Sequence, residues 1–174
     1  MVIEDQELER RLAHFKSIAQ HAGIKLTHQR LEIFRAVASS GRHPSVEAVY
    51  RTVRATMPTV SLDTVYRTLW LLSDLGLLNT LGPRQGGVRF DANLAHHHHY
   101  RCVRCGLIRD FESNDLNALQ IPDAVNRFGQ VVSARVEVQG VCAKCLGELA
   151  EAQTTETPTS PEAGEGADDD GGRR

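Results

Sequence analysis

Hydrophobic residues recur every three or four positions through residues 1–82, the spacing of one buried face of an α-helix. Four separate runs show this spacing, which predicts four short helices that pack through their apolar faces. The faces consist of Leu8, Leu12, Phe15, Ile18 and Ala19; of Leu31, Ile33, Phe34 and Val37; of Val46, Val49, Tyr50 and Val53; and of Leu62, Val65, Leu69 and Leu72.

Capping residues and helix breakers give the ends of these helices. Gly23 ends the first helix and Gly76 ends the fourth. Thr27, Ser45 and Ser61 precede the other three runs, where a side-chain hydroxyl accepts a hydrogen bond from a first-turn N–H. The sequence thus predicts helices two, three and four to begin directly after these residues.

Beyond Gly76 the pattern changes from helical spacing to short apolar segments. LLNTL and VRFD, separated by GPRQGG, predict a β-hairpin, so the first half has the outline of a winged helix-turn-helix. The second half predicts strands at HHYRCV, LIRDF and VVSARVEVQGV, and a short helix around Asn114–Phe128. We therefore expect an α+β protein with an N-terminal winged helix-turn-helix domain and a small C-terminal α/β domain.

Charge is distributed unevenly, although the whole chain carries only −2. Residues 1–90 contain 12 Lys and Arg against 8 Asp and Glu, whereas residues 150–174 contain 2 against 7. A basic first half is compatible with nucleic-acid binding, although this signal alone is weak. From Glu151 onward the chain has almost no apolar residues, so residues 151–174 are expected to form a disordered acidic tail.

The chain lacks an apolar run of membrane-spanning length, and its N-terminus, MVIEDQELERR, does not resemble a signal peptide. We therefore expect a cytoplasmic protein with no membrane partner. Thiols stay reduced in that compartment, so its cysteines are expected to bind metal and not to form disulfides.

All four cysteines fall in two Cys-x-x-Cys pairs, Cys102 with Cys105 and Cys142 with Cys145. Two residues between thiolates let both sulfurs reach one ion from a tight turn, and four thiolates form the tetrahedral site that suits Zn²⁺. Buried structural cysteines and a redox-active pair are the alternatives, but neither explains two identical spacings. The sequence therefore predicts a structural zinc site.

The fourth predicted helix, SLDTVYRTLWLL, has a polar face opposite its apolar one. This face presents Thr64, Arg67 and Thr68, with Tyr66 near its edge. Arginine can bind guanine through two hydrogen bonds, and Thr and Tyr can reach phosphates or thymine methyl groups. Taken alone, the segment is more typical of an ordinary solvated helix face. Its place before a hairpin in a basic half favours DNA binding.

Four consecutive histidines, His96–His99, precede the first cysteine pair. Alternate side chains of a strand share a face, so the run offers two pairs, His96/His98 or His97/His99, and periodicity does not decide between them. Imidazole and carboxylate ligands suit Fe²⁺, Mn²⁺ or Zn²⁺. An exposed polar strand is the alternative, but four histidines directly before the Cys102–Cys105 pair favour metal binding. The further candidate ligands are His43, Asp91 and Asp110.

The segments GIKLTHQRLEIFRAV, HPSVEAVY, VSLDTVYRTLWLLSDLGLL, RFD, HHHHYRCVRCG and GVCAKC together resemble the ferric uptake regulator family, over about Leu8 to Leu149. The resemblance implies a homodimeric winged-helix repressor, not an enzyme, that binds palindromic double-stranded DNA and holds its dimer and structural zinc in the C-terminal domain. By position it implies zinc ligands Cys102, Cys105, Cys142 and Cys145; DNA contacts from Tyr66 and Arg67; and a regulatory Fe²⁺ or Mn²⁺ site of His43, Asp91, His97, His99 and Asp110.

Asp110 stands where iron sensors of the family have Glu and peroxide sensors have Asp, so the chain resembles the peroxide-responsive branch. The resemblance then implies that iron-catalysed oxidation of His97 or His99 ends repression. An iron-responsive repressor of the same family is the alternative. A non-haem iron enzyme and a zinc-stapled protein-interaction module are the competing functions outside it.

These expectations combine into a two-state hypothesis. Residues 1–84 form the DNA-binding domain, 85–91 a hinge, 92–150 the dimerisation and metal-binding domain, and 151–174 the tail. His43 lies on one side of the hinge and the other proposed ligands lie at or beyond it. One ion bound by both sides would therefore favour the arrangement that places two recognition helices on successive turns of the major groove.

Overall fold

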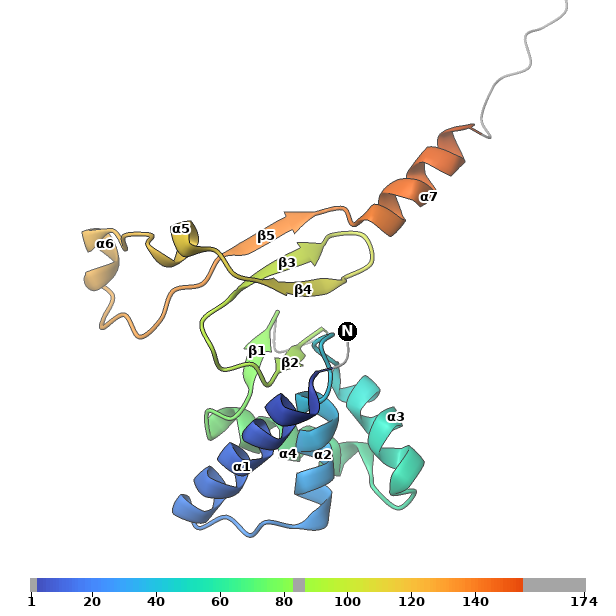
Figure 1. Cartoon of the computed structure of the whole chain (residues 1–174), viewed down its shortest axis with the longest axis vertical. Coiled ribbons are helices and arrows are strands. Elements are labelled where there is room, and N and C mark those ends of the chain that lie inside the picture. The colour runs from blue at the N-terminus through green and yellow to red at the C-terminus, as the bar shows by residue number, and fades with distance from the viewer. Residues whose placement is uncertain (1–2, 83–86, 155–174) are drawn as a thin grey trace, which may run out of the picture. The chain divides into compact units, whose positions relative to one another are not determined.

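The computed structural model describes residues 3–82 and 87–154. The chain divides into two compact units, Met1–Gly140 and Val141–Arg174. Within the described residues, the first unit contains six helices and all five strands, and the second contains one helix (Figure 1). None of these helices combines the length and the apolar character needed to cross a membrane. The architecture is α+β, as predicted.

Four helices open the first unit, and the predicted N-caps of the last three are confirmed. The Oγ of Thr27, Ser45 and Ser61 each accepts a hydrogen bond from a first-turn N–H, at 3.3, 3.3 and 3.1 Å. Gly23 and Gly76 both have positive φ, which suits glycine at the end of a helix. The helices are α1 (Asp5–His21), α2 (His28–Ala38), α3 (Val46–Thr56) and α4 (Leu62–Asp74).

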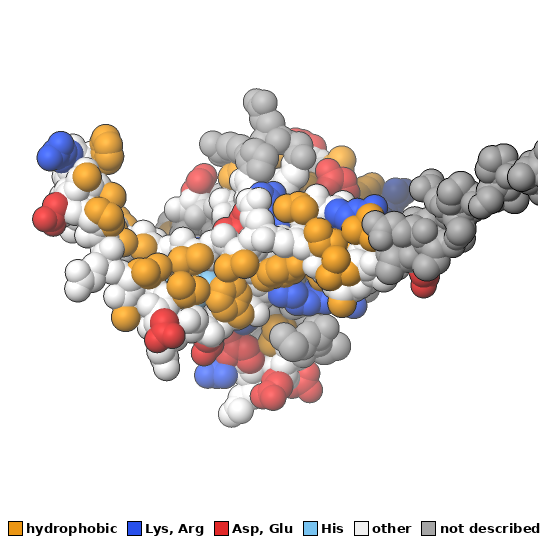
Figure 2. Space-filling view, turned by 90° about the horizontal axis from the view of Figure 1, so that it is seen from above, with side chains coloured by type: hydrophobic (Ala, Val, Ile, Leu, Met, Phe, Trp, Pro, Cys, Tyr) orange, Lys and Arg blue, Asp and Glu red, His pale blue; other side chains and the backbone are white. Residues whose placement is uncertain are grey.

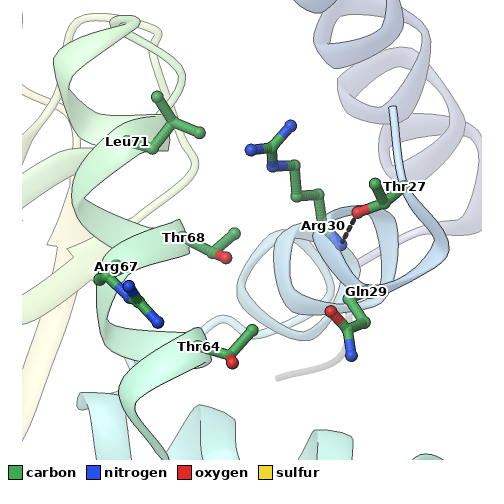
Figure 3. Close-up of a pocket in the computed structure, with 7 residues that line it drawn as sticks. All are labelled: Thr27, Gln29, Arg30, Thr64, Arg67, Thr68 and Leu71. Carbon is green, nitrogen blue, oxygen red and sulfur yellow. Dashed lines mark hydrogen bonds between the residues drawn. The ribbon is translucent and has the colours of Figure 1, made fainter. Parts of the chain in front are cut away.

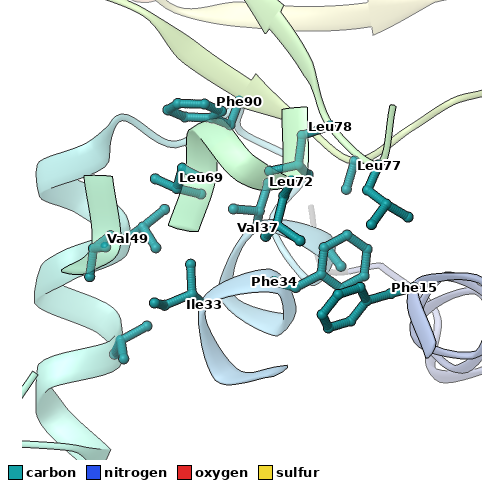
Figure 4. Packing of buried hydrophobic residues seen from close by; sticks show 14 of the residues in the cluster. Phe15, Ile33, Phe34, Val37, Val49, Leu69, Leu72, Leu77, Leu78 and Phe90 are labelled. Atoms are coloured by element: carbon teal, nitrogen blue, oxygen red, sulfur yellow. The ribbon is translucent and has the colours of Figure 1, made fainter. Parts of the chain in front are cut away.

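The buried faces of these helices form one hydrophobic core (Figure 4). The Phe15 and Phe34 rings lie with centroids 4.7 Å apart and join α1 to α2. Val65, Leu69 and Leu72 of α4 are buried in the same core, as predicted. Leu62 was predicted to join them, but its side chain is exposed because it lies at the start of α4, outside the packed stripe.

The predicted hairpin is present and closes one side of this core. Strand β1 (Asn79–Leu81) pairs antiparallel with β2 (Arg89–Asp91), so Asn79 lies opposite Asp91. Phe90 is fully buried, and its ring lies 5.7 Å from that of Trp70 on α4. The predicted turn between the strands falls largely outside the described residues.

A second sheet contains β3 (His98–Cys102), β4 (Ile108–Phe111) and β5 (Glu137–Gly140), in the order β4-β3-β5. Strand β3 pairs antiparallel with β4 and parallel with β5. The strand predicted over 131–141 is shorter than expected, because only residues 137–140 lie beside β3. The single helix predicted near Asn114–Phe128 is instead two short helices, α5 (Asn114–Asn117) and α6 (Asp123–Asn126).

The second unit contains α7 (Ala143–Thr154), a helix that the sequence pattern did not predict. This helix continues past Glu151, so the first residues of the expected tail are helical. The remainder of that tail lies outside the described residues. The expected hinge, 85–91, falls within the first unit and includes β2, and the domain boundaries stay a prediction.

Candidate functional site

Three histidines and an aspartate gather at one buried point of the first unit. One ligand atom from each of His43, Asp91, His97 and His99 lies within 4.8 Å of the others, and all four residues are buried. His43 lies in the connection from α2 to α3, Asp91 is the last residue of β2, and the other two come from the start of β3 and the residue before it. The cluster thus draws on the helical part, the hairpin and the second sheet.

Asp110 of β4 adds a fifth group to the cluster. Its Oδ1 lies 2.8 Å from Nε2 of His43, 3.8 Å from Nε2 of His97 and 3.6 Å from Nε2 of His99. The register explains this position, because His99 and Asp110 are direct partners across β3 and β4. The Asp110 side chain is part exposed, so the cluster reaches the surface on this side. The five residues expected from the sequence are therefore brought together.

His43 has an unusual backbone conformation. Its φ is 47°, in the left-handed region that non-glycine residues rarely occupy, and the following residue is Pro44, which normally favours an extended predecessor. The Pro44 carbonyl accepts a hydrogen bond of 3.0 Å from the N–H of Phe90, which ties this loop to β2. Strained backbone of this kind is concentrated at functional sites, where neighbouring contacts maintain it.

The imidazole nitrogens of the cluster are arranged to bind a metal ion and do not all form hydrogen bonds with one another. Nδ1 of His97 lies 2.7 Å from the Ala95 carbonyl, a contact in which Nδ1–H donates and Nε2 is left facing the cluster. Nε2 of His97 and Nε2 of His99 then approach within 2.9 Å. Nε2 of His43, though close to Asp110, lacks hydrogen-bond geometry to any described residue. A buried His43 Nε2 without a hydrogen bond and two further ring nitrogens that converge on the same point are typical of a site that binds a cation.

The carboxylates make the cluster negative. Burial opposes ionisation of Asp91, but the imidazoles of His97 and His99 outweigh it, and the pKa of Asp91 falls far below its usual value. Burial also opposes ionisation of Asp110, and the contact with His43 lowers its pKa overall. The pKa of His97 is raised, because the contact with Asp91 outweighs burial. Two ionised carboxylates beside three imidazoles suit a divalent cation with nitrogen and oxygen preference.

The other two histidines of the run face away from this cluster. Nδ1 of His98 accepts a 3.2 Å hydrogen bond from the N–H of Val136, and its Nε2 lies 2.9 Å from Oδ1 of Asn117. His96 is exposed, and its Nε2 lies 3.1 Å from the carbonyl of Ala134. Both nitrogens of the buried His98 ring therefore have partners. The alternating faces of β3 separate the two pairs, as the strand pattern predicts.

The four cysteines occur as two Cys-x-x-Cys pairs, Cys102 with Cys105 in the first unit and Cys142 with Cys145 in the second. Cys102 ends β3, and its carbonyl accepts a 3.0 Å hydrogen bond from the N–H of Gly106. Gly106 has a φ of 69°, so glycine relieves the backbone just after the first pair, as expected. Four sulfurs at this spacing are consistent with a structural zinc site.

The exposed face of α4 carries most of the residues expected to contact DNA. Tyr66 is 44% exposed, Arg67 is exposed, and Thr64 is half-buried. Thr68 was assigned to this face, but it is only 7% exposed because it lies on the side of α4 that approaches α2. Its expected place on the exposed face is therefore wrong, although its side chain lines the notch between α2 and α4, and its contact with DNA stays a prediction. The exposed surface centres on the other three residues.

A notch between α2 and α4 adds residues that the sequence reasoning missed (Figure 3). It encloses 360 Å³ and is lined on the α2 side by Thr27, Gln29 and Arg30. Arg67 of α4 lines the opposite side. Thr27 is the N-cap of α2, and Gln29 and Arg30 lie in its first turn. A predicted N-cap indicates a helix N-terminus that can face an anion, so the cap was the sequence signal for these residues. The notch therefore presents arginines from two different helices.

Comparison with known proteins places this architecture and these clusters in one group. Residues 21–139 match the Ferric uptake regulator family. The peroxide-responsive repressor PerR of Staphylococcus aureus is 32% identical over 146 residues, which cover 83% of this chain and 98% of that protein. The ferric uptake regulator of Helicobacter pylori, whose structure is said to reveal three functional metal binding sites, has a TM-score of 0.66 and 25% identity, over 84% of this chain and 97% of that one. The ferric uptake regulator of Francisella tularensis, solved with iron, has a TM-score of 0.60 and 28% identity, over 71% of this chain and 96% of that one.

Proposed function

Because the chain belongs to the ferric uptake regulator family, it is a metal-dependent transcriptional regulator, and we propose that it is a homodimeric repressor that senses hydrogen peroxide. Proteins of this family bind DNA and are regulators, not enzymes, which removes the non-haem iron enzyme from consideration. The observation that carries the proposal is the convergence of His43, Asp91, His97, His99 and Asp110 on one point.

The regulatory ion is proposed to be Fe²⁺ or Mn²⁺. Three imidazole nitrogens and two carboxylates favour these borderline and hard ions, whereas the four thiolates suit Zn²⁺ as a structural ion. The Ala95 carbonyl fixes the tautomer of His97, so that Nε2 offers a lone pair to the ion. Asp91 is held by the N–H of Asn93, which donates to its Oδ1 at 2.7 Å, and this orients the carboxylate.

Binding of one ion to this site would tie three parts of the first unit together. His43 precedes α3, whereas Asp110 and His99 belong to the second sheet. A ligand shifts a conformational equilibrium only as far as it prefers one state. We call the arrangement in which one ion joins His43 to the other ligands the closed state, and the arrangement without this link the open state. To change a mostly open population into a mostly closed one, the ion must prefer the closed state by about 10⁴-fold, or about 5.5 kcal/mol. The His43 ligand and the relief of repulsion between Asp91 and Asp110 supply that preference.

DNA recognition is proposed for the exposed face of α4. Tyr66 and Arg67 extend from a helix that follows α3 across a short turn and precedes the hairpin, which is the arrangement of a winged helix-turn-helix. Arg67 is positioned to bind guanine in the major groove and Tyr66 to contact a thymine methyl group or phosphate. Arg30 and Gln29, across the notch, would contact the backbone of the same duplex (Figure 3).

Hydrogen peroxide would end repression by modifying a ligand. Fe²⁺ held by these residues would give one electron to hydrogen peroxide within reach of the ring carbons of His97 and His99 and recover one as the ring is oxidised, so that the iron acts as a catalyst. Overall, the O–O bond of hydrogen peroxide breaks, one oxygen replaces the hydrogen on a ring carbon of His97 or His99, and the other oxygen leaves as water. An oxidised imidazole is a poorer ligand, so the site loses the ion and the closed state loses its support. The part exposure of Asp110 gives peroxide a route to the cluster.

Homodimerisation is proposed to involve the apolar surface around residues 119–138. Hydrophobic side chains gather in a band on one face (Figure 2). Phe128 is 90% exposed and Val132 is 94% exposed, which is unusual for large apolar groups in a soluble monomer. A second copy of the chain would cover them, and a two-fold dimer would present two α4 helices to the two halves of a palindrome.

Mass spectrometry tests the peroxide proposal directly. Trypsin releases residues 90–101, which contain the whole histidine run, in one peptide. After a peroxide pulse to anaerobic Fe²⁺-loaded protein, we expect one added oxygen on this peptide, at His97 or His99, together with loss of DNA binding. His96 and His98 in the same peptide are internal controls and should remain unmodified, as should Mn²⁺-loaded protein. Retention of full DNA affinity with an unmodified peptide would favour the iron-responsive alternative.

A further inference from the structure

The DNA-facing helix carries a carboxylate beside its arginine. Oδ2 of Asp63 lies 2.5 Å from Nη2 of Arg67, one helical turn further along α4. The side chain of Asp63 is 67% exposed and that of Arg67 is 73% exposed. Residues four apart share a helix face, so the pair projects together from the surface that carries Tyr66. The sequence predicted a DNA contact for Arg67 but indicated no role for Asp63.

Helix stability explains Asp63 only in part. A carboxylate in the first turn of a helix interacts favourably with the helix dipole, and an exposed ion pair stabilises a folded protein little. On a surface that approaches DNA, however, a carboxylate repels the phosphates and weakens binding to every sequence. Asp63 therefore lowers the affinity for DNA of any sequence. A carboxylate at this position is useful for DNA binding only if it improves discrimination between sequences.

The contacts around the pair favour such a role. The Oγ1 of Thr64 is within 2.8 Å of the Ser61 Oγ, so the neighbouring hydroxyl is engaged in the cap. Across the notch, Nη1 of Arg30 donates to the Lys25 carbonyl at 2.6 Å. Among the described residues, the ion-pair partner of Asp63 is therefore Arg67. The carboxylate engages one nitrogen of the planar guanidinium and restrains its orientation, and the other nitrogens remain able to donate.

Resting on the proposed DNA-binding function, we propose that Asp63 is a positioning residue that makes Arg67 selective for guanine. At a guanine, Arg67 can bind the base edge and keep its contact with Asp63. At another base, Arg67 gains a partner only by turning towards a phosphate, which leaves the Asp63 carboxylate unpaired beside the DNA backbone. This penalty falls on the wrong sequences and so increases discrimination.

The test uses full-length protein loaded with Mn²⁺ and two duplexes. The first is the sequence that the wild-type protein selects from a random library, and the second is the same sequence shuffled. For Asp63→Asn, the ratio of the two dissociation constants should fall about tenfold, mainly because the shuffled duplex binds more tightly. Asp63→Glu keeps the charge and should retain the ratio to within about threefold.

Two further variants separate positioning from simple charge. Asp74→Asn removes one exposed negative charge from the other end of α4 and should leave the ratio within about twofold of wild type. In an Arg67→Gln background, adding Asp63→Asn should change the ratio by less than about twofold, because Asp63 acts through Arg67. A merely structural role would not produce this dependence.

Two results would overturn this inference but leave the proposed DNA-binding function intact. The first is a wild-type ratio of dissociation constants in Asp63→Asn, and the second is an equal fall of that ratio in Asp74→Asn. If the wild-type protein selects no sequence from the library, the proposed DNA-binding function fails and this inference fails with it. The two failures are therefore distinguishable.

Discussion

His97 shows how single contacts prepare an imidazole for metal binding. Its Nδ1 donates to the Ala95 carbonyl, and its Nε2 lies 3.0 Å from Oδ2 of Asp91. Without an ion, the contact with Asp91 raises the pKa of His97 and so favours a proton at Nε2, the atom that faces the cluster. Proton and metal therefore compete for the same atom. The lowered pKa values of Asp91 and Asp110 keep both carboxylates ionised over the same pH range.

This competition predicts the pH dependence of metal affinity. The pKa of His97 lies above 6.5 in the metal-free protein, so Mn²⁺ affinity should rise with pH and level off above that raised pKa. Below it, affinity should fall by about tenfold per pH unit for the one proton displaced. Competition of Mn²⁺ with a fluorescent chelator between pH 6 and pH 8 measures this. A constant affinity over that range would show that His97 is not a ligand.

The helices illustrate what the sequence predicts well. Ser45 and Ser61 cap helices where their hydroxyls precede an apolar run of helical spacing, because cap and periodicity are local properties. Strand β5 was harder to predict, because its length depends on which residues lie beside β3, a tertiary contact. Helix α7 was missed because no capping residue or long apolar stripe marks it. Thr68 was misplaced because α2 covers one side of α4.

In the candidate site, too, local sequence patterns predicted some features, and others depended on contacts between distant segments. Spacing alone predicted both cysteine pairs and showed that alternate histidines share a face. The choice of His97 and His99 rested on family resemblance, and the structure now places them beside Asp91. No sequence pattern indicated the left-handed backbone of His43, because the Phe90 hydrogen bond to Pro44 that anchors this loop crosses between distant segments.

The notch between α2 and α4 leads to a prediction about DNA binding. Arg30 is expected to contact a phosphate and not a base, because it lies near the N-terminus of α2 and not on α4. Arg30→Ala should weaken binding to selected and shuffled duplexes by similar factors and reduce the slope of log affinity against log salt by about 1. Fluorescence anisotropy over a range of salt concentrations measures both quantities. A loss confined to the selected duplex would assign Arg30 to base recognition instead.

At the scale of the whole molecule, two chains are expected to form the DNA-binding species. Val132→Glu places a charge on the apolar surface proposed as the dimer interface, and a buried unpaired charge is strongly unfavourable. We expect sedimentation velocity to give a dimer for the wild-type protein and a monomer for this variant. Glu112→Gln, at an exposed polar position outside that surface, is the control and should remain dimeric. A dimeric Val132→Glu protein would place the interface elsewhere.

The central claim is that one ion, bound by His43 and by residues of the hairpin and second sheet, produces the state that binds DNA. The most direct test is the Mn²⁺ dependence of binding to the selected duplex for wild type and for His43→Asn. Asparagine tolerates the left-handed backbone at this position but is too short to replace the imidazole. His96→Ala, outside the cluster, is the matched control.

Wild type and His96→Ala should bind the duplex at least about 100-fold more tightly with Mn²⁺, as expected for strong coupling between two sites. His43→Asn should keep its fold by circular dichroism and lose most of this gain. A His43→Asn protein with the full wild-type response to Mn²⁺ would contradict the claim.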